Sequence, residues 1–305
     1  MKAALLLTVV YFLHCEGAVV VRSDTAPVVN DRPIVGVLSQ EQSFYLHGKY
    51  PEENYTSYIA ASYVKDVEAS GMSLVLIPGG ATFFNQSNGY ADAGQHIYEI
   101  AQELNDAGDY FPIFGTCLGF ELLIILASGR GYPENRIRCY SFENIPLDFT
   151  EDFRDSKMFK EAPEDVIDLL AHEDVTVNAH QFCIVDEVTL IKITYLFHRY
   201  PFYGVQFHPE KSSFEWKKSK NYPHSINAVK SNRYFMDFFV KECRKNLHTF
   251  ANQAEENQYV IYNYEPHFTG VLGSMYHQCY FFEPRDFLAT LNSVYIPIYV
   301  YMDYL

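Results

Sequence analysis

The sequence is short of positive charge. Its 305 residues include 23 Lys and Arg against 38 Asp and Glu, which gives a formal net charge of -15 at pH 7. A chain with this balance does not bind nucleic acid or an anionic membrane through bulk electrostatic attraction, and an anionic substrate would need a local basic pocket. Hydrophobic residues make up 48% of the chain, which excludes a disordered protein and is enough for a full core.

Cysteine and long apolar runs are also scarce. Six cysteines in 305 residues exclude a small, disulfide-dense scaffold. The apolar run over residues 3–13 is shorter than the roughly 20 residues that a membrane-spanning helix needs. The apolar tail over residues 287–305 is interrupted by Asn292, Ser293 and Pro297, so it makes a poor membrane span. No repeat or low-complexity linker divides the chain, which favours a single domain.

Residues 1–17 are typical of a secretory signal peptide. Lys2 precedes the apolar run, and Cys15 and Gly17 place small residues before a cleavage site. Residues 18–30 then form a short leader. The triplets that begin at Asn54 and Asn85 match the N-glycosylation pattern. These features predict entry into the secretory pathway, with the lysosome or the extracellular space as the destination.

Cleavage after Gly17 would leave an odd number of cysteines. The five that remain are Cys117, Cys139, Cys183, Cys243 and Cys279. In an oxidising compartment at least one thiol then stays outside any intramolecular disulfide, and such a lone thiol is a candidate nucleophile. The pairing of the last four cysteines is left open by the sequence.

Unbroken apolar segments alternate with helical patterns along the chain. Strands are expected at 33–38, 74–77 and 110–114, separated by helices over 58–69 and from about 97 to 108. Further on, a helix is expected near 164–171, a short strand at 205–207 and an amphipathic helix over 226–245. Apolar strands separated by helices require a parallel sheet covered on both faces. The predicted fold class is therefore α/β, with a doubly wound, mostly parallel sheet.

The segment Gly115-Thr116-Cys117-Leu118-Gly119 lies between the third expected strand and an apolar helix. Glycines on both sides of Cys117 allow the tight strand-turn-helix that projects a nucleophile, as in the serine elbow of other hydrolases. The helix N-terminus favours a thiolate. A buried structural cysteine in a glycine turn is the alternative, so a second motif is needed.

The second motif is His208-Pro209-Glu210, which follows the expected strand at 205–207. Ligands of parallel sheets bind at the carboxyl ends of the strands, and both motifs follow such ends. His208 can therefore act as general acid and base for Cys117, with Glu210 holding its other ring nitrogen. On its own His208 would be interpreted as a structural or surface histidine.

A third motif is the glycine turn Pro78-Gly79-Gly80 after the second expected strand. Acyl transfer needs two N–H donors directed at the developing oxyanion, and the backbone amides of Gly80 and Leu118 are the natural pair. An ordinary turn between strand and helix is the alternative for this segment.

In their order along the chain, the glycine turn, the cysteine motif and the histidine motif resemble the class I glutamine amidotransferase superfamily. Within it they resemble the gamma-glutamyl hydrolase family, which cleaves folate polyglutamates. The segments that carry this resemblance are Arg32 to Glu41, Asp109 to Glu121, Tyr203 to Lys211, Glu215 to Lys217, Asn227 to Lys230 and Phe238 to Val240. The resemblance covers residues 31–283, expected to form the catalytic domain. It implies a flavodoxin-like core, no metal and no organic cofactor, and a homodimer.

The resemblance also assigns a second active-site histidine, His180, which the sequence pattern alone would not single out. Three features depart from the family. The interval between His180 and His208 is short, Thr82 to Asn85 replaces charged residues, and the tail over 284–305 has no recognised role.

The implied reaction is hydrolysis of a gamma-glutamyl isopeptide bond. The Cys117 thiolate, paired with protonated His208, would attack the gamma carbonyl and form a thioester that water then cleaves. Two alternatives stay open: a glutaminase subunit that passes ammonia to a synthetase, and a non-catalytic secreted protein of the same fold.

Overall fold

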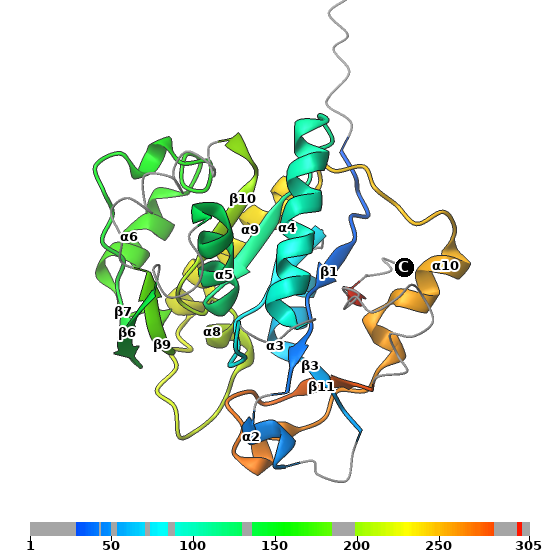
Figure 1. The fold of residues 1–305 in the computed structure, drawn as a ribbon. Helices are drawn as coiled ribbons and strands as arrows, with labels where there is room; N and C mark the ends of the chain where they lie inside the picture. The colour runs from blue at the N-terminus through cyan, green and yellow to red at the C-terminus, as the bar shows by residue number, and fades with distance from the viewer. Residues whose placement is uncertain are drawn as a thin grey trace, which may run out of the picture.

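A five-stranded sheet lies at the centre of the molecule (Figure 1). The computed structural model describes residues 29–42, 44–49, 54–70, 74–84, 89–129, 136–184, 199–283 and 298–300. The strand order is β10-β5-β4-β1-β12. Four strands run parallel, namely β1 (Val35–Val37), β4 (Leu74–Ile77), β5 (Ile113–Thr116) and β10 (Phe202–Val205). The edge strand β12 (Ile298–Val300) is antiparallel to β1.

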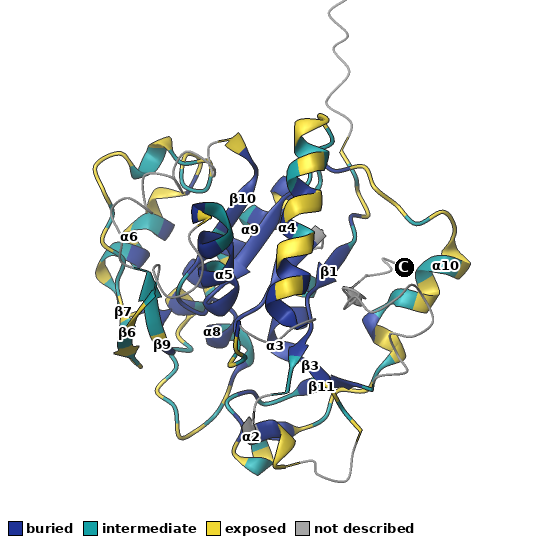
Figure 2. Cartoon of the chain, in the orientation of Figure 1, coloured by how far each residue is buried: buried dark blue, intermediate teal, exposed yellow. Residues whose placement is uncertain are grey.

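Both faces of this sheet are buried because successive side chains of each strand point to opposite sides. Leu76 and Phe114 contribute to one hydrophobic cluster, and their neighbours Ile77 and Ile113 contribute to another. The first cluster is covered by α3 (Ala61–Ser70) and α9 (Ile226–Cys243), the second by α4 (Tyr90–Asp106) and α5 (Leu118–Ser128). Figure 2 shows the consequence for α4, whose outer face is exposed and whose inner face is buried.

Three smaller sheets surround this core. The first contains β2 (Gln40–Glu41), β3 (Ser57–Ala60) and β11 (Cys279–Phe282), the second β6 (Arg136–Ser141) and β9 (His180–Ile184), and the third β7 (Asn144–Ile145) and β8 (Thr176–Val177). In the described part of the chain, the other α-helices are α2 (Phe44–His47), α6 (Glu164–His172), α8 (Lys211–Phe214) and α10 (Gln253–Tyr259). Short 3-10 helices occupy Phe153–Asp155, Ile261–Asn263 and Thr269–Leu272.

The predicted fold class is confirmed, because the central sheet is mostly parallel and helices cover both of its faces. Four boundaries were wrong. The helix expected from about residue 97 is α4, which begins at Tyr90 because the core-facing residues start there. The segment Ser57–Ala60 is strand β3 rather than the first turn of a helix, since it pairs with β2 and β11. The strand expected at 110–114 is β5, which begins at Ile113. The strand expected at 205–207 is β10, which ends at Val205. Both boundaries follow from the pairing of these two strands with each other across the sheet.

The expected signal peptide over 1–17 lies outside the described residues, and so does most of the tail. Within the tail, Ile298–Val300 extends the central sheet at its β1 edge. Among the described residues, none of the helices combines the length and the hydrophobicity of a transmembrane segment.

Candidate active site

Cys117 occupies the sharp turn between β5 and α5. Its backbone angles are φ 50° and ψ -105°, and it is the one non-glycine residue with positive φ in the part of the chain that the structure describes. Such strain in a residue with a side chain is characteristic of a nucleophile elbow. The turn is held by a hydrogen bond from the Cys117 amide to the carbonyl of Val205 on β10, at 2.8 Å.

The elbow forms because two glycines let backbone segments approach closely. A Cβ atom on Gly119 would lie 1.9 Å from the carbonyl oxygen of Ile77 at the end of β4. One on Gly115 would lie 2.7 Å from the backbone of Gly119 itself. The first turn of α5 is therefore packed directly on the ends of β4 and β5, which fixes the position of Cys117.

His208 is held at the same edge of the sheet. Its backbone amide donates to the carbonyl of Val177 at 2.8 Å, and its Nδ1 lies 2.8 Å from Glu210 Oε1. His208 and Glu210 are 3% and 0% exposed, so solvent water does not screen the electrostatic interaction between them. Gly79 joins the two motifs, because a Cβ built on it would lie 2.9 Å from His208 Cε1 and 3.1 Å from the Cβ of Cys117. The structure thus brings Cys117, His208 and Glu210 together.

The charge states of this group follow from burial. Burial lowers the pKa of His208 below its ordinary value, although the nearby Glu210 carboxylate raises it. The imidazole is therefore neutral at pH 7 and can accept a proton. Burial alone would raise the pKa of Glu210, but His208 and Lys211 lower it, so this carboxyl stays ionised.

Cys117 differs here from the expectation of a preformed thiolate. Burial raises the pKa of its thiol, and the carboxylates of Glu121 and Glu210 raise it further. Lys211 and the amide of Leu118 lower this pKa, but to a smaller extent. The resting pair is consequently a thiol beside a neutral imidazole, and the thiolate forms when His208 takes the proton.

The predicted oxyanion donors are the amides of Leu118, which directly follows the nucleophile, and of Gly80, which directly follows the Gly79 that packs against Cys117. The Leu118 amide lies near the sulfur of Cys117 and lowers the pKa of its thiol. At the glycine turn, the carbonyl of Gly79 accepts a hydrogen bond from Gln40 Nε2 at 2.9 Å. Since C=O and N–H of a trans peptide point in opposite directions, the Gly80 amide points away from Gln40. The role of the Gly80 and Leu118 amides as oxyanion donors stays a prediction.

Tyr63 is a residue of this site that sequence reasoning missed. Its hydroxyl accepts a hydrogen bond from the Gly79 amide at 3.0 Å and lies 3.2 Å from His208 Nδ1. It thereby connects the glycine turn to the histidine. The helical spacing of α3 marks Tyr63 as a core residue, and nothing in the sequence distinguishes it from its apolar neighbours.

Lys211 is a second residue without a predicted role. It is 1% exposed, and its Nζ lies 3.6 Å from Glu210 Oε1. Although burial alone would lower its pKa, Glu210 and other anionic partners raise it, so the ammonium group stays charged. In the sequence, the feature that could have marked Lys211 as a site residue was its position directly after His208-Pro209-Glu210.

A third set of missed residues lies on the other side of Cys117. Glu121 accepts hydrogen bonds from Arg136 at 2.8 Å and from Gln206 at 3.1 Å, and Gln206 Nε2 lies 3.9 Å from the Cys117 sulfur. The Arg136 guanidinium also lies over the ring of Phe182. Arg136 therefore neutralises the carboxylate that lies closest to this side of the nucleophile, and the pair carries no net charge.

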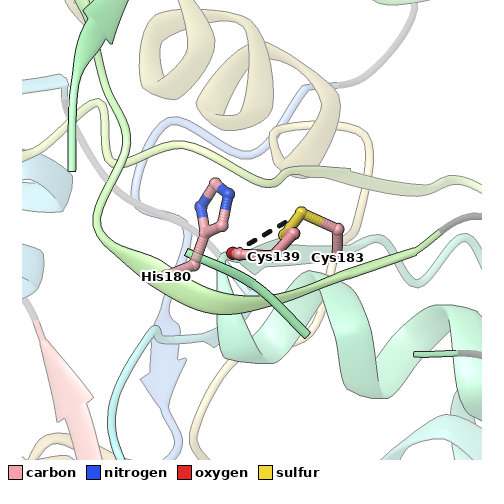
Figure 3. Close-up of side chains that lie close together, drawn as sticks. All are labelled: Cys139, His180 and Cys183. Atoms are coloured by element: carbon pink, nitrogen blue, oxygen red, sulfur yellow. Dashed lines mark hydrogen bonds between the residues drawn. A yellow bond between two sulfur atoms is a disulfide. The ribbon is translucent and has the colours of Figure 1, made fainter. Parts of the chain in front are cut away.

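His180 lies at the start of β9 and is 8% exposed. Burial lowers its pKa, and the neighbouring His208 lowers it further. Three residues later, Cys183 forms a disulfide with Cys139, as Figure 3 shows beside the imidazole of His180. The other described cysteines, Cys117 among them, are free and buried.

Of the two predicted glycosylation sites, Asn54 is exposed, as a glycan requires. Asn85 lies outside the described residues, and so does most of the short interval before His208, over 185–198.

Comparison with known proteins identifies the class to which this fold and site belong. The family model of Glutamine amidotransferase class-I matches residues 52–222. The chain is also 36% identical to gamma-glutamyl hydrolase of Mus musculus, over 83% of this chain and 90% of that protein. It is 34% identical to gamma-glutamyl hydrolase of Homo sapiens, over 91% and 98%, and 30% identical to gamma-glutamyl hydrolase B of Dictyostelium discoideum, over 79% and 80%.

The chain therefore belongs to the class-I glutamine amidotransferases and, among them, to the gamma-glutamyl hydrolase family. This confirms the resemblance inferred from the three motifs.

Proposed function

We propose that this protein hydrolyses gamma-glutamyl isopeptide bonds, with folate polyglutamates as substrates and Cys117 as nucleophile. The observation that carries the proposal is the buried cluster in which Cys117 and His208 both pack against Gly79, with Glu210 2.8 Å from the histidine. Membership of the gamma-glutamyl hydrolase family supports the substrate class.

The reaction begins with transfer of the Cys117 proton to His208. The thiolate attacks the gamma carbonyl, and the amides of Leu118 and Gly80 bind the resulting oxyanion. The C–N bond then breaks, and His208 gives its proton to the departing amine, which leaves a gamma-glutamyl thioester on Cys117. His208 next removes a proton from water, which attacks the thioester and returns the thiol.

Glu210 and Lys211 support this cycle without touching the substrate. Glu210 holds Nδ1 of His208, so the other ring nitrogen is the one that exchanges protons. Lys211 partly neutralises Glu210. The carboxylate therefore stabilises the His208 imidazolium but still lets it give up its proton.

The test is glutamate release from a folate polyglutamate of defined length. Cys117→Ala is expected to lower the rate at least about 10³-fold, because removal of a covalent nucleophile leaves only binding and the oxyanion donors. Cys243→Ala, which removes an equally buried thiol on α9, serves as the control and should keep most of the activity. An undiminished rate for Cys117→Ala would sink the assignment.

We also propose a homodimer and passage through the secretory pathway to the lysosome or the cell exterior. The family membership supports the first, and the signal-like residues 1–17 support the second. Light scattering of the purified protein checks the dimer.

A further inference from the structure

Three potential metal ligands meet at the ribbon formed by β6 and β9. One ligand atom each of Cys139, His180 and Cys183 lies within 4.8 Å of the other two. Figure 3 shows the imidazole alongside the two sulfurs. The register explains this convergence. Arg138 pairs with Phe182 but Ser141 pairs with His180, so Cys139 and Tyr140 of β6 lie opposite the single residue Gln181 of β9. Such a bulge redirects side chains.

His180 provides an independent sign of a ligand site. The residue is 8% exposed, yet its Nδ1 has no hydrogen-bond partner among the described residues. A buried polar nitrogen without a partner costs free energy, so a native structure normally satisfies it. Neutral imidazole nitrogen is also the commonest protein ligand for transition metals.

In the oxidised protein the two sulfurs are bonded to each other and are not thiolates, the form of cysteine that binds metals. Reduction changes this. A small-molecule dithiol breaks the S–S bond, becomes a cyclic disulfide itself, and transfers two electrons and two protons to Cys139 and Cys183. We propose that the reduced ribbon binds one Zn²⁺ through the thiolates of Cys139 and Cys183 and the imidazole of His180.

The chemistry of the three ligands suits this ion. Zn²⁺ takes thiolate and imidazole ligands at about 2.3 and 2.0 Å, so neighbouring ligand atoms lie roughly 3.5 Å apart. The cluster, which spans at most 4.8 Å, needs only small movements to reach this geometry. Binding releases the two thiol protons, and water occupies the fourth position. Because His180 adjoins His208, the ion would lie at the wall of the active site.

Co²⁺ is a suitable probe, because thiolate ligation produces an intense charge-transfer absorption. The full chain is used with Cys117→Ala, which removes the catalytic thiol. One sample stays oxidised, and the other is reduced with a dithiol that is then removed under inert gas. The reduced protein is expected to bind one equivalent of Co²⁺ with the thiolate band, and Zn²⁺ should displace it. The oxidised protein should show no such band.

Two further variants separate a built site from adventitious binding. His180→Ala in the reduced protein should weaken Co²⁺ binding about 10-fold or more. Removal of a metal ligand lowers the affinity at least as much as removal of a residue that only hydrogen-bonds to a ligand. His172→Ala, at an exposed position on α6, should bind as the parent does. Equal binding by reduced and oxidised protein, or by the His180→Ala variant and its parent, would overturn the proposal. Loss of the circular-dichroism signal on reduction would overturn it as well.

Discussion

Cys117 and His208 are both buried, and burial decides in which form they meet the substrate. It raises the pKa of the thiol and lowers the pKa of the imidazole, so both groups are neutral before the reaction. A neutral imidazole is the form that a general base must have. The lowered pKa of His208 extends this neutral form to pH values below 6.5, the ordinary pKa of histidine.

The pH dependence of kcat/KM tests this assignment. Activity requires neutral His208, so the acidic limb of the profile should lie below pH 6.5 and activity should fall as pH drops through the lowered pKa. Glu210 raises the pKa of His208, so Glu210→Gln should move the limb to still lower pH. The plateau should fall by less than the roughly 10²–10⁴-fold that general acid–base catalysis supplies.

Glu215→Gln is the matched control for this experiment. Glu215 is also buried and lies five positions after Glu210, but it accepts a hydrogen bond from the His277 amide. Its variant should leave the acidic limb where it is. A limb that stays in place in Glu210→Gln, or that moves upward, would contradict the role of Glu210.

At the scale of elements, the elbow depends on direct backbone packing between β4 and α5. Gly119→Ala places a methyl group 1.9 Å from the Ile77 carbonyl oxygen, which the backbone cannot avoid without moving. The variant is expected to lose more than about 2 kcal/mol of unfolding free energy, measured by urea denaturation. It should also lose activity, because Cys117 moves with the helix.

Gly129 at the end of α5 provides a comparison. It has φ 66°, but a Cβ built there meets nothing within 4 Å. Gly129→Ala should therefore cost only about 1–2 kcal/mol, from the backbone conformation alone. Equal losses for the two variants would show that close packing is not what fixes the elbow.

The sequence predicted the parallel sheet well, because apolar strands and amphipathic helices are local patterns. It failed where partners are distant along the chain. The strand Ser57–Ala60 reads as the start of a helix until its pairing with β11 is known. The same holds for the Cys139–Cys183 disulfide, which the cysteine positions alone could not select. Tyr63 was missed because an active-site tyrosine at helical spacing looks like a core residue.

For the whole molecule, the signal-like residues 1–17 and the exposed Asn54 make a prediction about processing. Expressed in a eukaryotic secretory host, the protein should begin after Gly17 and carry a glycan at Asn54. Asn54→Gln should reduce the apparent mass by one glycan, as judged by endoglycosidase digestion and mass spectrometry. An intracellular product that retains Met1 would contradict secretion and favour the glutaminase alternative.

The net charge of -15 is not offset by an excess of positive charge at the nucleophile, because the two cations on either side of it are paired with carboxylates. Arg136 is paired with Glu121 on one side of Cys117, and Lys211 with Glu210 on the other. The bulk charge disfavours nucleic acid as a partner class but says little about an anionic small molecule.

The central claim is that Cys117 carries the glutamyl group during turnover. Rapid acid quenching of the enzyme during hydrolysis of a folate polyglutamate, followed by mass spectrometry of the digested protein, tests it directly. The account predicts a thioester adduct on the peptide that contains Cys117, which forms and decays at rates compatible with turnover. Full turnover with no adduct on Cys117, or an adduct on another residue, would contradict it.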